Sequence, residues 1–112
     1  MSEPLDVAVR RTLDAFESLA RDLDRSSVGL RPGYRSTLDG QLRSLRQLDV
    51  ECAGGNPSRR AWSLGQAAHP VLASLLNGAG KPAVGLDAER IDECRQALAS
   101  FGRALTDHAE GR

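Results

Sequence analysis

The chain has 112 residues, 40% of them hydrophobic and 27% charged, and its fifteen Lys and Arg residues balance fifteen Asp and Glu residues. A length of this order suits one domain (1–112) whose core needs no disulfides. A balanced charge argues against a non-specific polyanion binder, which needs a surplus of basic side chains to release counterions. No apolar run reaches the length of a membrane span, and the opening MSEPLDVAVRR lacks the apolar segment of a secretory signal. We therefore expect a cytoplasmic protein with two free thiols, Cys52 and Cys94.

The first predicted helix covers residues 2–26. Ser2 suits the N-cap, Pro4 suits the first turn, and Asp6 suits the positive end of the helix dipole. Apolar or small side chains recur at helical spacing, which predicts a buried stripe. Its members are Leu5, Val9, Thr12, Leu13, Phe16, Leu19, Ala20 and Leu23. Charged residues occupy the opposite side, which we interpret as a solvated face.

The second predicted helix begins at Tyr34 or Ser36 and ends at Ala53, before the strong stop signal Gly54-Gly55. Its apolar residues recur close to every 3.5 positions, the spacing of a helical bundle. They are Tyr34, Leu38, Leu42, Leu45, Leu48 and Cys52.

The third predicted segment covers residues 57–77, with Asn56 as the N-cap and Pro57 at the first helical position. Pro70 lies inside it, removes one helical hydrogen bond and disfavours helical angles at His69. We therefore expect two short helices that meet near His69, or one helix kinked there. The apolar or small side chains expected on one side are Trp62, Gly65, Ala68, Leu72, Leu75 and Leu76.

The last predicted helix begins after an Asp87 N-cap and runs to about Ala109. Its stripe consists of Ile91, Cys94, Leu98, Phe101 and Leu105. Leu and Ala outnumber β-branched residues, which favours helix over strand throughout. The fold class that follows is all-α: an up-and-down bundle of four helices, the third broken or kinked at Pro70.

Little in the sequence indicates a cofactor or a metal. The segment GAGK (78–81) lacks the glycine and the Ser or Thr of a phosphate-binding loop, since Leu75 and Pro82 occupy those places. The two cysteines and two histidines show no local spacing typical of a zinc site. Both cysteines fall on apolar stripes, where a thiol packs as a small hydrophobe. We expect no cofactor and no metal.

Two resemblances keep other functions open. SLLNGAGKPAVGLDAERIDECRQAL (74–98) resembles the end of a phage-repressor-type helix-turn-helix domain, which implies a DNA-binding regulator. However, residues 68–76 leave no room for the turn and the full recognition helix, and Pro70 interrupts that segment. RRTLDAF (10–16) resembles the first helix of small helical enzymes of the chorismate mutase type, which implies a small all-α enzyme with an active-site lysine. The single Lys81 lies in a connecting segment.

The function that we favour is a non-catalytic interaction or regulatory module. Helical bundles of this size commonly act through protein–protein contacts, and Trp and Arg are the residues that most often dominate interfaces. The candidate partner-binding residues are Arg59, Arg60, Trp62 and His69. The partner is another protein or a second copy of the chain, a homodimer being favoured; DNA is a less favoured partner and no membrane contact is expected. Fourteen Arg against one Lys suggest a GC-rich, bacterial genome.

Overall fold

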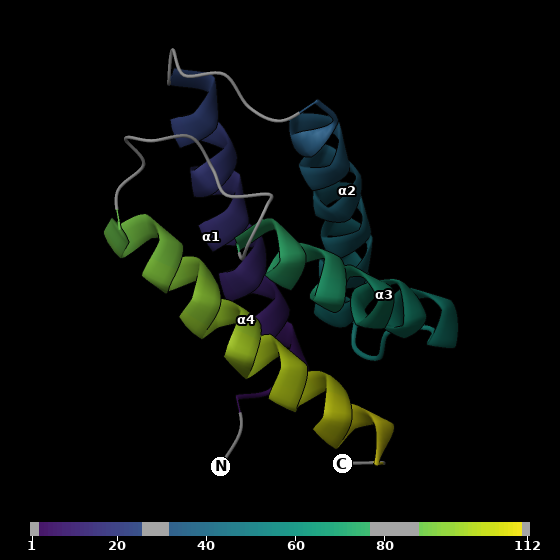
Figure 1. Cartoon of the computed structure of the whole chain (residues 1–112). Coiled ribbons are helices and arrows are strands. Elements are labelled where there is room, and N and C mark those ends of the chain that lie inside the picture. The colour runs from purple at the N-terminus through teal and green to yellow at the C-terminus, as the bar shows by residue number, and fades with distance from the viewer. Residues whose placement is uncertain (1–2, 26–31, 77–87, 111–112) are drawn as a thin grey trace.

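The computed structural model describes residues 3–25, 32–76 and 88–110, and within them the protein is all-helical. The helices are α1 (Leu5–Arg25), α2 (Tyr34–Ala53), α3 (Arg59–Leu76) and α4 (Ala88–Ala109). α1 packs against α2 and α4, and α3 packs against the same two helices, so the extensive contacts form a closed ring. Figure 1 shows α1 and α2 side by side, with α3 and α4 slanting across them. The predicted all-α fold with four helices is confirmed for the described residues.

The buried stripes of α1 and α2 follow the predicted spacing. In α2 the buried residues are the six that the sequence predicts, from Tyr34 to Cys52. In α1 all the predicted residues are buried except Leu5, which is half-buried, and Ala8 joins them. Because the apolar positions recur at helical spacing, one side of each helix leaves water, and burial of this stripe is the main source of stability.

α3 is one helix from Arg59 to Leu76, so the predicted break at Pro70 is wrong. Pro70 is exposed, and so is Gln66, whose carbonyl loses its helical partner because proline has no N–H. Water can reach that carbonyl on the outer side of α3. The helix therefore continues past the proline without leaving a buried polar group unsatisfied.

The start of α3 also differs from the prediction. The side chain of Ser58, not Asn56, caps the helix: its Oγ accepts a hydrogen bond from the Ala61 N–H at 3.1 Å, and its carbonyl accepts one from the Trp62 N–H at 3.0 Å. Gly54 ends α2 as expected. The other predicted caps, Ser2 and Asp87, lie outside the described residues.

Small side chains bring α1 and α4 close together. Ala8, Thr12 and Ala97 are buried where these helices meet. The Thr12 hydroxyl lies 2.8 Å from the Ala8 carbonyl oxygen of its own helix and 3.2 Å from the Ala97 carbonyl oxygen of α4. The thiol of Cys94 donates to the Ala15 carbonyl at 3.5 Å. A shared seam without large side chains leaves a shallow trough on its outer side, which is described below.

Ion pairs on the surface connect neighbouring helices. Arg10 pairs with Asp49 at 2.9 Å, Arg46 pairs with Glu17 at 2.9 Å and Arg35 pairs with Asp24 at 3.0 Å, so these three pairs join α1 and α2. Arg90 of α4 pairs with Asp22 of α1 at 2.9 Å. Because these side chains are partly exposed, the pairs contribute little to stability.

Candidate partner-binding surfaces

The four residues singled out in the sequence all lie on α3 but not on one side of it. Arg59 and Arg60 are exposed at its start, and Arg60 lines a groove shared with α2. Trp62 is half-buried, and its indole N–H donates to the Leu105 carbonyl of α4 at 3.2 Å. The structure therefore separates the basic residues from the aromatic one.

His69 lies two turns after Trp62 and also faces α4. Its Nε2 is 3.0 Å from the Leu98 carbonyl oxygen, and its ring centroid is 6.2 Å from that of Phe101. The ring lies so close to α4 at Gly102 that a Cβ at that position would be 2.8 Å from His69 Nε2. Trp62 itself packs against the core cluster. Both side chains thus hold α3 against α4.

The groove that contains Arg60 runs between α2 and α3 and has a volume of about 420 Å³. We call it the α2–α3 groove. It is lined by Arg43, Ser44, Gln47, Glu51, Arg60, Ala61 and Leu64.

Glu51 is the one carboxylate that lines the α2–α3 groove, and its oxygens already have partners. Oε1 accepts a hydrogen bond from the Ser58 N–H at 2.7 Å, and Oε2 accepts one from the Gln47 amide at 2.7 Å. Hydrogen bonding from Ser58, then that from Gln47, and the nearby Arg60 charge hold the pKa of Glu51 below its usual range. Arg43, by contrast, forms no ion pair with a carboxylate of the described residues. The groove therefore carries positive charge that the Glu51 carboxylate neutralises only in part.

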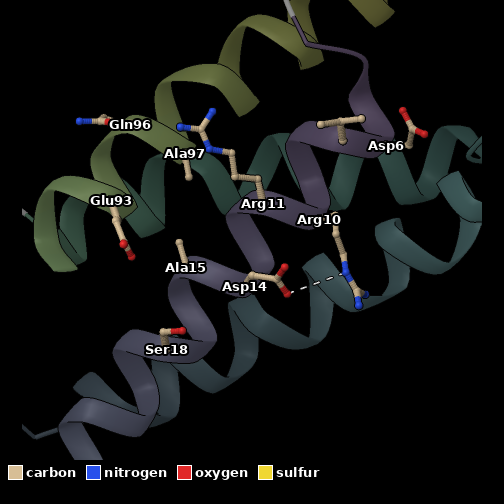
Figure 2. Close-up of a pocket in the computed structure, with 10 residues that line it drawn as sticks. Asp6, Arg10, Arg11, Asp14, Ala15, Ser18, Glu93, Gln96 and Ala97 are labelled. Carbon is tan, nitrogen blue, oxygen red and sulfur yellow. Dashed lines mark ion pairs between the residues drawn. The ribbon is translucent and has the colours of Figure 1, made fainter. Parts of the chain in front are cut away.

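A wider groove, of about 730 Å³, runs along the seam between α1 and α4. Figure 2 shows Ala15 and Ala97 facing one another across it, with Arg11 reaching from α1 toward α4 and Glu93 on the opposite wall. We call it the α1–α4 groove. Its lining residues are Asp6, Val7, Arg10, Arg11, Asp14, Ala15, Ser18, Glu93, Gln96 and Ala97.

Within the α1 wall of this groove, Val7, Arg11, Asp14 and Ser18 form one helical stripe, beside Asp6, Arg10 and Ala15. The Val7 side chain is 47% exposed. Arg11 pairs with Glu3 at 2.6 Å on the surface, whereas Asp14 lies 3.8 Å from Arg10. The wall thus combines an exposed apolar side chain with charges of both signs.

The two cysteines are packed rather than reactive. Cys52 and Cys94 are buried and free of disulfides. Burial raises the pKa of Cys52 to about 11 and that of Cys94 to about 12. Because the thiolate is the nucleophile, neither thiol is activated at neutral pH.

The described part of the chain holds neither a metal-ligand cluster nor a helix that could span a membrane. Within residues 3–25, 32–76 and 88–110, no three His, Cys, Asp or Glu side chains come together as a metal site. None of the described helices combines the length and apolar character that crossing a bilayer requires.

No family model, no curated protein and no solved structure matches this chain.

Sequence reasoning named Arg60 but missed both grooves. The stripe of Val7, Arg11, Asp14 and Ser18 has helical spacing, but only its Asp14 belongs to the charged side of α1 that the sequence predicts to be solvated. The sequence signal that could have indicated the α1–α4 groove is the apolar Val7 within this stripe. A groove, however, needs two helices, and the pairing of α1 with α4 depends on long-range packing.

Proposed function

We propose that this protein is a non-catalytic helical interaction module that binds a protein partner through the α2–α3 groove. The observation that carries the proposal is the charge in that groove. Arg43 and Arg60 line it, while the carboxylate of Glu51 is held by Ser58 and Gln47. Arg59, exposed next to Arg60 in the sequence at the start of α3, adds a third cation.

Arginine favours the binding of an acidic segment. A guanidinium donates two parallel hydrogen bonds to a carboxylate, and such charge-assisted bonds are roughly twice as strong as neutral ones. Leu64, which is half-buried, supplies apolar surface in the lining of the groove. A partner with acidic side chains flanking an apolar one would match this arrangement.

Trp62 and His69 remain part of the predicted partner surface, and the contacts described above give them a supporting role as well. Their bonds to the carbonyls of Leu105 and Leu98 fix α3 against α4. Since Arg59 and Arg60 lie at the start of the same helix, this contact holds the basic end of α3 in place.

The proposal is tested by removing the positive charge. The immobilised chain is exposed to an extract of its host, and the retained proteins are identified for the wild type and for an Arg43→Glu/Arg60→Glu variant. We expect a partner that the variant loses. With that partner purified, the affinity should fall by at least about tenfold, because two interface arginines commonly contribute more than 1 kcal/mol each.

The matched control is Arg25→Glu, which changes the charge of an exposed arginine at the end of α1, outside both grooves. Circular dichroism should show the same helicity for all three proteins. A partner that binds the wild type and the double variant equally would refute the α2–α3 groove as the binding surface.

Direct assays distinguish the two alternative functions that the sequence left open, a DNA-binding regulator and a small all-α enzyme. Residues 77–87 of the segment 74–98 that resembles a helix-turn-helix lie outside the described residues. A DNA-binding regulator would shift duplex DNA on a gel at low ionic strength and lose the complex as salt is added. A small all-α enzyme would have to use residues outside those named above, since Arg59, Arg60, Trp62 and His69 form no acid–base pair among the described contacts.

The same proposal includes the finer features predicted from the sequence. These are an up-and-down order of the four helices, a bend in α3 at Pro70, bacterial origin and a cytoplasmic location. The two packed, reduced cysteines support the cytoplasmic location.

A further inference from the structure

The geometry points to a second copy of this chain as the occupant of the α1–α4 groove, with the two α1 helices packed antiparallel about a twofold axis. This inference goes beyond the proposed function and involves a different face of the molecule. It stands on the pattern of the α1 stripe, on the exposure of Val7 and on the small residues of the groove floor.

The α1 stripe is self-complementary when it is read in the opposite direction. Val7, Arg11, Asp14 and Ser18 are separated by four, three and four positions, so the spacing is the same from either end. An antiparallel second α1 therefore places its Asp14 opposite Arg11 and its Ser18 opposite Val7. A twofold axis repeats each contact, which gives two Arg11–Asp14 pairs across the interface.

The parallel arrangement lacks this match. It would place Arg11 against Arg11 and Asp14 against Asp14, and like charges in register oppose association. The existing partners do not prevent the antiparallel arrangement. Arg11 pairs with Glu3 on the exposed surface, and the Asp14 carboxylate is 3.8 Å from Arg10, so both contacts exchange readily with those of a second copy.

The floor of the groove allows close approach. Ala15 presents only a methyl group where a second helix would lie, Ala97 is buried, and Val7 offers an exposed apolar side chain to the contact. Small side chains at the contact permit short distances between helix axes. Figure 2 places Glu93 near the level of Ala15, on the wall that Arg11 of an antiparallel copy would approach.

Cysteine cross-linking tests the register. In the antiparallel arrangement Val7 faces Ser18 of the other copy, so a Val7→Cys/Ser18→Cys variant should form a disulfide-linked dimer under mild oxidation. Within one copy these positions are about 16 Å apart along the helix, too far for an internal disulfide. Val7→Cys alone is the matched control and should not cross-link, because its counterpart lies a similar distance away. The native thiols are buried and do not interfere.

Charge exchange tests the pairing. We expect sedimentation of the wild type to show a concentration-dependent monomer–dimer equilibrium. Arg11→Asp should weaken dimerisation by at least about tenfold, and Arg11→Asp/Asp14→Arg should restore it, since the pairs re-form with reversed sign. Arg25→Asp, an equal change of charge outside the groove, should leave dimerisation unchanged.

Several outcomes would overturn the inference. A wild type that stays monomeric at every concentration would exclude a second copy as the occupant. Cross-linking of Val7→Cys alone, as readily as of the double-cysteine variant, would show a parallel register. A dimer that Arg11→Asp does not weaken would lie elsewhere on the surface. Each result is independent of the α2–α3 groove, so the proposed function and this inference fail separately.

Discussion

Gly65 of α3 faces Leu48 of α2 at a distance that only a glycine allows: a Cβ at Gly65 would lie 2.6 Å from Leu48 Cδ2. It would also lie 3.2 Å from Phe101 Cζ, on the α4 side. Three helices therefore converge on a position without a side chain. The packing of α3 against α2 and α4 depends on this close approach.

Gly65→Ala should destabilise the protein. Alanine would gain about 1 kcal/mol of helix propensity, but its methyl group must displace two packed side chains at a cost of about 1–3 kcal/mol, so we expect a net loss of up to about 2 kcal/mol. Urea unfolding followed by circular dichroism measures the change. Gly40→Ala is the matched control: its Cβ would meet only the flexible end of Arg43 at 3.9 Å, so this change should stabilise the protein. Equal effects of the two substitutions would contradict the packing described here.

The cap of α3 gives a second prediction. Ser58→Ala removes the side-chain oxygen that accepts the Ala61 N–H, and the free energy of unfolding should fall by about 1 kcal/mol. Asn56→Ala changes the residue that sequence rules favour as the cap, yet it should alter stability by no more than about 0.5 kcal/mol because Asn56 is exposed. The opposite ranking in urea unfolding would show that the helix begins at Asn56.

The third prediction concerns Glu51 and pH. Hydrogen bonds from Ser58 and Gln47, together with the nearby Arg60 charge, lower the pKa of Glu51 from its ordinary value of 4.5. A carboxylate with a lowered folded-state pKa stabilises the fold above its unfolded pKa, and this contribution is lost as the pH falls through the folded value.

Glu51→Gln should therefore destabilise the protein at about pH 7, and the difference should shrink at about pH 3 as the Glu51 carboxylate takes up a proton. Urea unfolding at the two pH values measures the difference. Asp24 also has a lowered pKa, caused first by its hydrogen bond to Arg35, so some acid sensitivity should persist in the variant. A Glu51→Gln effect of the same size at both pH values would refute this role for the charge.

Thiol accessibility is the fourth prediction. Cys94 is fully buried and Cys52 is 7% exposed, and burial raises the pKa of both thiols. In the native protein neither should react with a thiol reagent at neutral pH on the timescale of a free cysteine, and both should react once the chain is unfolded. Because opening of the fold limits the reaction, a destabilising change such as Gly65→Ala should accelerate it. Rapid reaction of either thiol in the native wild type would contradict the packing.

Trp62 provides a fifth prediction. Trp62→Ala removes a half-buried ring that packs on the core and should lower the free energy of unfolding by about 2–3 kcal/mol. Trp62→Phe retains most of the contact and loses the N–H bond to Leu105, for a loss of about 1 kcal/mol. Both values come from denaturant unfolding. If Trp62→Ala left stability unchanged, Trp62 would be a surface residue whose role is confined to partner contact.

Local sequence patterns predicted the helices because the apolar spacing of each helix lies within its own residues. The α2 stripe from Tyr34 to Cys52 is buried as its spacing predicts, and Gly54 ends that helix. The apolar spacing that predicts each helix is contained in a short window of sequence.

Features set by two helices together were not predicted. Glu17 of α1 pairs with Arg46 because α2 packs beside it. Ser58 became the cap partly because Glu51 of α2 accepts a hydrogen bond from its N–H. Of the candidate surfaces, Arg60 was named, whereas the α1–α4 groove depends on a pairing between distant helices that no local pattern contains.

The contact between Thr12 and Ala97 also bears on how the chain behaves while it is being made. It joins positions 85 apart, so at about 5–20 residues per second the ribosome needs roughly 4–17 s to supply α4 after Thr12. During that interval α2 can already cover the leucines of α1, but the side of α1 that will meet α4 stays in water. That side includes the small residues Thr12 and Ala15, which contact Ala97 and Cys94 of α4. A nascent chain that exposes these small side chains offers chaperones and neighbouring nascent chains little apolar surface to bind.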